Sequence, residues 1–250
     1  MQVLIFLSLA ILGLVLGSFL AAYTYRYPRA VSIVKGRSVC DSCKKQISWF
    51  DNVPLVSYLI LGGKCRSCSQ KISVRYPFIE GLTGVIFLTI GLFKAPLFLT
   101  LFMLLISSVL ICVFVIDLEN QIIPDELIYI LLLSTYFFLF IQASASVFLN
   151  LFVGFATSLF FLGIHLLTKG KGMGLGDVKF AIFAGTFWGW PKSLIWTYTS
   201  FLTGAFVGII LIWMKKVKFG RKIAFGPYLV VSFFLVYFFG ETLKKWLISF

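Results

Sequence analysis

Long apolar stretches separated by short polar loops dominate the chain, and eight of them are candidate membrane-spanning helices. They cover roughly residues 2–23, 77–93, 96–116, 125–142, 146–167, 178–190, 193–214 and 224–240. A helix needs about 20 apolar residues to cross a hydrocarbon layer about 30 Å thick, so the second and sixth stretches are short for a span. The pattern predicts an all-α polytopic membrane protein with about eight transmembrane helices.

One polar segment interrupts this pattern near the start of the chain. It divides the sequence into a first transmembrane helix (1–23), a polar module (24–76) and a helical membrane body (77–250). Hydrophobic residues make up 60% of the 250 positions, more than a soluble domain of this size carries. The first 23 residues have no basic stretch before the apolar run, which favours a retained helix over a cleaved signal peptide.

The net charge of +13 is distributed unevenly, and its distribution predicts the topology. Ten of the 22 basic residues lie between Arg26 and Arg75, and most of the others fall on the same side if eight spans alternate. The positive-inside rule then makes the polar module cytoplasmic and puts both termini outside. We interpret the charge as a topology signal with a secondary attraction to anionic membrane lipid, and we expect no nucleic acid partner.

Four cysteines in the polar module form two pairs, Cys40-x-x-Cys43 and Cys65-x-x-Cys68. Paired knuckles at this separation are typical of a tetrahedral zinc site, and short β-like runs after each pair suit a zinc ribbon. The alternative is a set of structural or redox cysteines without metal, but a cytosolic location disfavours disulfides. We therefore predict a structural Zn²⁺ with four cysteine ligands. Cys112 lies in an apolar run and is expected to be an inert core residue.

Two acidic residues lie at the cytoplasmic ends of predicted helices. Asp117 follows the apolar run LFMLLISSVLICVFVI, and Asp177 opens the sixth stretch in KGMGLGDVKFA. Ionisable groups at this depth are costly and point to function. Two facing carboxylates can share one proton and act as base and acid in peptide hydrolysis. The alternative for Asp177 is a helix N-cap, and the residues alone leave both interpretations open.

Neighbouring residues have simpler explanations. Asp125 follows Pro124 at the start of a predicted helix, where an acidic residue meets the positive helix end. The glycines before Asp177 do not fit a nucleotide-binding loop, because a membrane helix precedes them instead of a strand. A flexible turn and a close approach of substrate to the backbone both remain open. His165, the sole histidine, is expected to be an interfacial or hydrogen-bonded residue.

A set of motifs in fixed order covers nearly the whole chain and resembles the bacterial type IV prepilin peptidases, which are bifunctional leader peptidases and N-methyltransferases. The motifs are GSFL (17–20), Arg26 with Pro28, the CxxC…CxxC module containing ISWFDNVPLVSYLILGGKC, Tyr76 with Glu80, Asp117 with IPD (123–125), GLGDVK (174–179) and FGPYL (225–229). Each motif is modest alone, whereas the ordered set is specific.

The resemblance implies that Asp117 and Asp177 are the catalytic aspartates of a membrane aspartyl endopeptidase. It implies cleavage of a short basic leader from prepilin-like or pseudopilin-like proteins on the cytoplasmic face of the bacterial inner membrane. Methylation of the new N-terminus with S-adenosylmethionine would follow, through residues 24–76. Where members commonly carry asparagine after GSFL, this chain has Ala21. The matched motifs also contain the supporting residues Glu80, Asp125, Gly174, Gly176 and Lys179.

Two other classes of protein share parts of this pattern. A proton-coupled transporter would place its acids near the bilayer midplane, whereas these aspartates lie at the cytoplasmic boundary. A membrane-tethered zinc-ribbon interaction protein would tolerate the loss of both aspartates.

Overall fold

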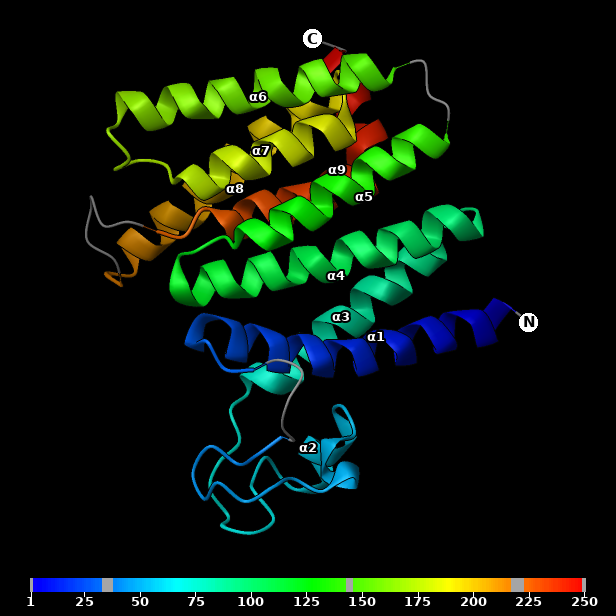
Figure 1. Ribbon diagram of the computed structural model, residues 1–250, viewed down its shortest axis with the longest axis vertical. Helices are drawn as coiled ribbons and strands as arrows, with labels where there is room; N and C mark the ends of the chain where they lie inside the picture. The colour runs from blue at the N-terminus through cyan, green and yellow to red at the C-terminus, as the bar shows by residue number, and fades with distance from the viewer. Residues whose placement is uncertain (1, 33–37, 143–145, 217–222, 249–250) are drawn as a thin grey trace. The chain divides into compact units, whose positions relative to one another are not determined.

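The computed structural model describes residues 2–32, 38–142, 146–216 and 223–248, with side chains to residue 245 (Figure 1). Over these ranges the protein is helical and contains no β-strand. The eight long helices are α1 (Gln2–Arg26), α3 (Arg75–Leu92), α4 (Leu97–Asn120), α5 (Asp125–Ile141), α6 (Val147–Leu167), α7 (Leu175–Trp188), α8 (Lys192–Trp213) and α9 (Gly226–Ile248).

The predicted all-helical architecture is confirmed, since one long helix occupies each of the eight predicted stretches. Five of these helices, α1, α4, α6, α8 and α9, are long and apolar enough to cross a membrane. The other three, α3, α5 and α7, have 18, 17 and 14 residues. The count of eight crossings therefore stays a prediction. The basic run predicted after the seventh stretch begins at Lys215, and its positions 217–222 lie outside the described residues.

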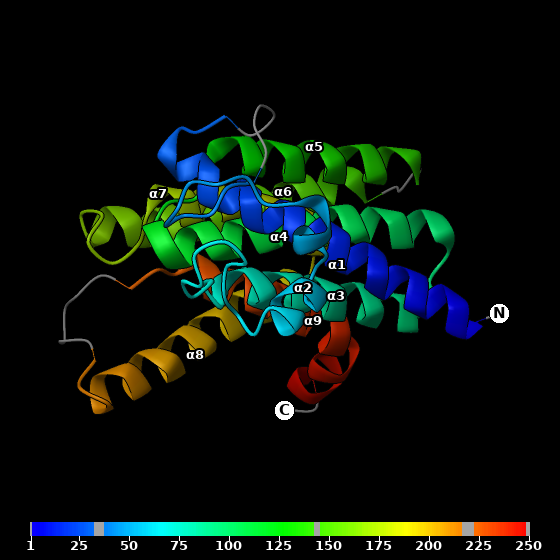
Figure 2. The same ribbon diagram turned by 90° about the horizontal axis from the view of Figure 1, so that it is seen from below.

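The chain forms two compact units, Met1–Cys112 and Val113–Phe250. The first contains α1, α3 and the polar module, which carries the short helices η1 (Tyr27–Arg29), η2 (Trp49–Asn52) and α2 (Val56–Ile60). Both views of the ribbon show α1 and α3 side by side (Figures 1 and 2). Their backbones approach closely, because a Cβ added to Gly13 would lie 2.8 Å from the Cα of Gly84.

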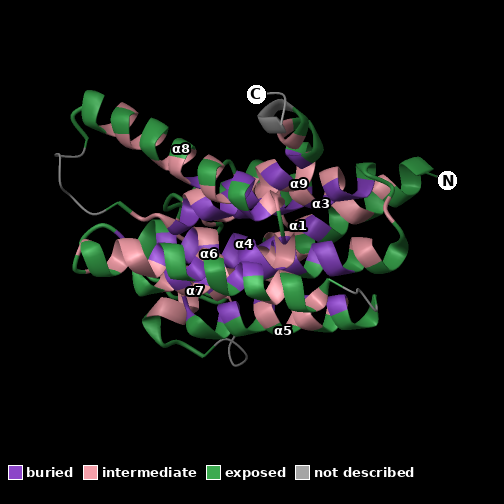
Figure 3. Cartoon of the chain, turned by 90° about the horizontal axis from the view of Figure 1, so that it is seen from above, coloured by how far each residue is buried: buried purple, intermediate pink, exposed green. Residues whose placement is uncertain are grey.

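The second unit has its core around α7, most of whose residues are buried. Three of its neighbours supply aromatic rings: Trp196 of α8 stacks on Phe161 of α6 at 5.7 Å, and Phe183 of α7 stacks on Phe233 of α9 at 5.5 Å. On α8 the buried residues all lie between Ser193 and Ser200, and the distal part of this helix has only intermediate and exposed residues (Figure 3).

Helices α6 and α7 touch through glycine, which gives a stability prediction. A Cβ at Gly154 would collide with the Thr186 hydroxyl and lie 2.8 Å from the Ile182 carbonyl oxygen. Small residues allow such close packing of membrane helices. We expect Gly154→Ala to lower the free energy of unfolding by about 1–3 kcal/mol, as overpacking does. Thermal unfolding of the purified protein in detergent measures the change.

Gly163 provides the matched control on the same helix, because a Cβ there meets nothing within 4 Å. Gly163→Ala improves helix propensity by up to about 1 kcal/mol without a clash. The two variants should therefore shift the unfolding midpoint in opposite directions. Equal shifts would show that α6 and α7 do not pack closely at Gly154.

Candidate active site

Asp117 lies in the last turn of α4 and is 5% exposed. Val113, Val115 and Ile116 before it are fully buried or nearly so, and they carry the aspartate into the interior of the second unit. The backbone N–H of Gly226 donates a hydrogen bond to its Oδ2 at 2.8 Å. Since Gly226 is the first residue of α9, the carboxylate lies at the positive end of that helix.

Asp177 lies in the first turn of α7 and is 6% exposed. Its Oδ2 accepts a hydrogen bond from the backbone N–H of Gly174 at 3.0 Å. Gly174 is the residue that precedes the helix, so Asp177 is not the N-cap itself. Instead it reaches back to the N-cap backbone, as an acidic residue does at the third helical position.

Both aspartates are buried in the second unit, Asp117 beside the first residue of α9 and Asp177 in the first turn of α7. They come from different helices, α4 and α7, and each is held by the backbone N–H of a glycine. Two buried carboxyl groups at short range can hold one proton between them, because double ionisation is unfavourable. One carboxylate can then accept a proton while the other donates one.

Close packing accounts for one of the glycines that precede Asp177, Gly176. Its Cα lies against the side chain of Ile123, and an added Cβ would be 2.9 Å from the Ile123 Cβ. The loop after α4 therefore packs on the first turn of α7 only because a side chain is missing there. At this glycine the close approach is to the protein's own chain.

Lys179 and Asp125 join α7 to α5. The Lys179 ammonium donates to both carboxylate oxygens of Asp125 at 2.7 Å, and the two side chains are 44% and 48% exposed. Pro124, and not Asp125, is the N-cap residue of α5, and Asp125 is in the first turn, where a negative charge is favourable. An exposed ion pair of this kind contributes at most about 1 kcal/mol to the free energy of unfolding, so it links α5 and α7 with little effect on stability.

His165 fixes the loop that leads to Asp177. Its Nδ1 lies 2.8 Å from the carbonyl oxygen of Met173, one residue before Gly174. The loop is closed further by the Gly170 N–H, which donates to the His165 carbonyl oxygen at 2.8 Å. The sole histidine is thus a hydrogen-bonded residue, as expected.

Glu80 belongs to the first unit. It is 8% exposed on α3 and accepts the backbone N–H of Leu55 at 2.8 Å. Leu55 has φ 56° and ψ −46°, and the Val56 N–H donates to the Pro54 carbonyl oxygen at 2.6 Å, which makes a tight three-residue turn. Glu80 therefore anchors this turn of the polar module to α3.

The four module cysteines form one cluster in which all ligand atoms lie within 4.8 Å of one another. The sulfurs of Cys40 and Cys68 are 3.8 Å apart. Four Zn–S bonds of about 2.3 Å in a tetrahedron place sulfurs about 3.8 Å apart, so the cluster fits Zn²⁺. Because cysteine takes all four positions, the metal would hold the module together and leave no position for a substrate.

The two cysteine pairs lie on equivalent knuckles. In the first, the Cys40 N–H donates to the Lys45 carbonyl oxygen at 2.9 Å and Val39 forms a bridge with Gln46. In the second, the Cys65 N–H donates to the Gln70 carbonyl oxygen at 2.8 Å, with the corresponding bridge between Lys64 and Lys71. The predicted β-like runs are thus isolated β-bridges, because in each knuckle the two chain segments separate after one bridged residue pair.

Two protein-family models match successive parts of this chain. The bacterial Peptidase A24 N-terminal domain matches residues 11–93, and the Type IV leader peptidase family matches residues 103–209. A Prepilin leader peptidase/N-methyltransferase from Aeromonas hydrophila is 34% identical over 218 residues, covering 85% of this chain and 75% of the relative. This chain belongs to the type IV leader peptidase family.

Two further relatives with the same name match over most of their length. The protein from Neisseria gonorrhoeae is 33% identical over 257 residues, which cover 91% of this chain and 88% of the relative. The protein from Pseudomonas aeruginosa is 30% identical over 269 residues, which cover 96% and 92%. No solved structure matches the chain significantly. The resemblance inferred from the ordered motifs is confirmed.

The family match contains both aspartates but ends before the residue that holds Asp117. Gly226 lies beyond residue 209, and in the sequence FGPYL is recognisable only as a family motif and a helix start. A glycine followed by Pro227 at the start of an apolar helix is the signal that marks this position.

In the part of the chain that matches the N-terminal family domain, Ala21 is fully buried, and its carbonyl oxygen accepts a hydrogen bond from Arg75 at 2.8 Å.

Proposed function

We propose that this protein is a membrane aspartyl endopeptidase that cleaves the short basic leader of type IV prepilin-like or pseudopilin-like proteins. The observation that carries the proposal is the pair of buried carboxylates, Asp117 and Asp177, each held by a glycine N–H within the second unit. Membership of the leader peptidase family and the names of the relatives support the same activity.

The reaction needs one ionised and one protonated carboxyl group. The ionised member takes a proton from water as the water oxygen attacks the scissile carbonyl carbon. The protonated member donates its proton to the leaving amine, and the peptide bond breaks. After these two steps the former base is protonated and the former acid is ionised. Transfer of one proton from the first carboxyl group to the second restores the starting state. Because Gly174 and Gly226 fix the orientations of the carboxyl groups, the two proton transfers occur in a set geometry.

The proposed topology extends the five apolar helices to eight crossings. In this topology α3, α5 and α7 also cross the membrane, the module of residues 24–76 is cytoplasmic, and both termini lie outside. The excess of Lys and Arg in the module supports this orientation. Glu80, Asp125, Gly174, Gly176 and Lys179 act as supporting residues, and Cys40, Cys43, Cys65 and Cys68 bind a structural zinc ion.

The second proposed activity is N-methylation of the new N-terminus, which the names of the relatives support. S-adenosylmethionine would supply the methyl group. The described residues form no sheet that could bind a nucleotide-like cofactor at its edge, so we assign no residues to this cofactor. Neither a transporter nor a non-enzymatic zinc-ribbon protein is favoured by the family membership.

A cleavage assay tests both activities. Purified protein in detergent is incubated with a full-length prepilin-like substrate, with and without S-adenosylmethionine, and the mature N-terminus is analysed by mass spectrometry. We expect loss of the leader in both reactions and a methylated N-terminus only with the cofactor. An intact substrate would contradict the peptidase assignment, and a cleaved but unmethylated product would leave a peptidase alone.

Gly226→Ala gives a prediction for the anchor of Asp117. A Cβ at this position would lie 2.6 Å from Oδ2 and 3.0 Å from Cγ of Asp117, so the carboxyl group must shift. A displacement of about 1 Å in a catalytic group lowers a rate by about 100-fold. We expect a loss of that order in the rate of leader cleavage under single-turnover conditions.

Gly208 is the matched control, because it lies in α8 and an added Cβ meets nothing within 4 Å. Gly208→Ala should cleave at the unmodified rate. If Gly226→Ala also cleaves at that rate, the contact between α9 and Asp117 has no role in catalysis.

A further inference from the structure

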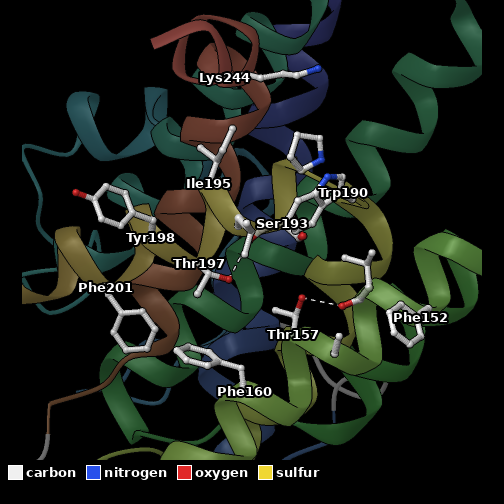
Figure 4. A pocket seen from close by; sticks show the side chains of 14 residues that line it. Phe152, Thr157, Phe160, Trp190, Ser193, Ile195, Thr197, Tyr198, Phe201 and Lys244 are labelled. Atoms are coloured by element: carbon white, nitrogen blue, oxygen red, sulfur yellow. Dashed lines mark hydrogen bonds between the residues drawn. The ribbon is translucent and has the colours of Figure 1, made fainter. Parts of the chain in front are cut away.

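A groove of about 680 Å³ lies between α6 and α8 in the second unit (Figure 4). Exposed aromatic rings from both helices line it, among them Phe152 and Phe160 of α6 and Tyr198 of α8. Both helices are long and apolar enough to cross a membrane. The groove is therefore a concave surface on two candidate membrane-spanning helices.

The wall of the groove is suited to hydrocarbon. The two threonines that line it use their hydroxyl groups within their own helices: Thr157 donates to the Val153 carbonyl oxygen at 2.7 Å, and Thr197 donates to that of Ser193 at 2.9 Å. No carboxylate lines the groove among the residues that the structure describes. An apolar chain fits this wall, whereas a polar ligand would find few partners.

One end of the groove is positively charged. Lys244 of α9 lies at the same end as Trp190, opposite Phe160 and Phe201 (Figure 4). Glu241 is paired with Lys192 at 2.7 Å, and Lys244 and Lys245 follow it on α9, so the lysines outnumber this carboxylate. Trp190 is exposed and Lys244 is half-buried, and tryptophan and lysine are typical of the membrane–water boundary, where an anionic headgroup would lie.

The form of the groove distinguishes two apolar occupants. A membrane-crossing helix of a partner is about 10 Å across and about 20 residues long, so it would lie over the outer faces of α6 and α8 and insert only side chains. A single hydrocarbon chain is narrow and flexible enough to enter the groove itself.

We propose that this groove binds an anionic phospholipid, with one acyl chain between α6 and α8 and the phosphate group at Lys244. The site is separate from the two aspartates and does not depend on the proposed peptidase activity. Its occupant comes from the bilayer and would fill a surface that otherwise leaves aromatic side chains unpacked.

Native mass spectrometry of the detergent-purified protein tests the proposal, with phosphatidylglycerol and phosphatidylcholine of identical chains as probes. We expect the unmodified protein to retain phosphatidylglycerol about fivefold better than phosphatidylcholine, as one lysine near an anionic headgroup provides. Lys244→Gln should remove this preference. Lys245→Gln is the matched control, because Lys245 is exposed but does not line the groove, and it should keep the preference.

Filling the groove tests the chain-binding part independently. Ala156 lines the groove from α6 and is exposed, so Ala156→Trp fills it without disturbing the core. We expect this variant to lose at least about fivefold in retention of both lipids. Ala205→Trp, at an exposed position of α8 away from the groove, should retain both lipids normally.

Three outcomes would overturn the proposal. They are equal retention of the two lipids by the unmodified protein, undiminished retention by Ala156→Trp, and a co-purifying peptide in place of lipid. Lys244→Gln lies near the end of α9 and leaves the core intact, so it decides the headgroup assignment even if the groove-filling variant does not fold.

Discussion

Asp117→Asn and Asp177→Asn are each expected to lower the rate of leader cleavage at least about 100-fold, because each removes one member of an acid–base pair. An amide oxygen can still accept the N–H bonds of Gly226 and Gly174, so the fold should be preserved. Single-turnover cleavage of a prepilin-like substrate measures the rate. Thermal unfolding in detergent shows whether the variants are folded.

The double variant makes the test sharper. Groups that act as a unit are strongly non-additive, so removing both aspartates should cost about as much as removing one. Glu241→Gln is the matched control, because it makes the same chemical change at an exposed carboxylate, 71% accessible, outside the pair. Near-normal cleavage by either aspartate variant would contradict the assignment of the catalytic pair.

Cys40→Ser and Cys65→Ser are expected to reduce bound zinc from about one ion per chain to nearly none, since each removes a thiolate from a closed four-cysteine site. Zinc binding in such sites contributes about 10–16 kcal/mol, which becomes folding free energy of the module. Metal analysis of the purified protein measures the content. Limited proteolysis should show new cleavage in the polar module of both variants, and chelator treatment should have the same effect.

Cys112→Ala is the control for these substitutions. Cys112 is buried in α4 and does not belong to the cysteine cluster, so its loss should leave zinc unchanged. Because the two knuckles have matching hydrogen bonds, Cys40→Ser and Cys65→Ser should be equally severe. Zinc retained by both serine variants would show that the cluster is not a tetrathiolate site.

The sequence could predict features that local chemistry decides. The eight helices follow from long apolar runs, and the cysteine cluster follows from two close pairs on a short spacer. The sixth apolar stretch predicts a start at residue 178, whereas α7 begins at Leu175 and takes in Gly176, although glycine disfavours helix. The hydrogen bond that the Gly174 N–H donates to the Asp177 carboxylate caps the first turn and offsets the low helix propensity of those glycines.

Contacts between distant parts of the chain could not be predicted. Asp117 and Gly226 are 109 residues apart, and no local pattern links them. Lys179 and Asp125 are 54 residues apart, and their pairing depends on how α5 and α7 pack. Each of these contacts is set by tertiary packing, which one sequence by itself does not reveal.

The way the two aspartates are held has a consequence for turnover. A lysine or arginine partner would hold a carboxyl group firmly only while it is negatively charged, so the anchor would weaken each time the group gained a proton. The backbone N–H groups of Gly174 and Gly226 do not titrate, and they can donate to a neutral carboxyl group as well as to an ionised one. In the proposed reaction, Asp117 and Asp177 can therefore exchange roles as proton donor and acceptor without losing their alignment.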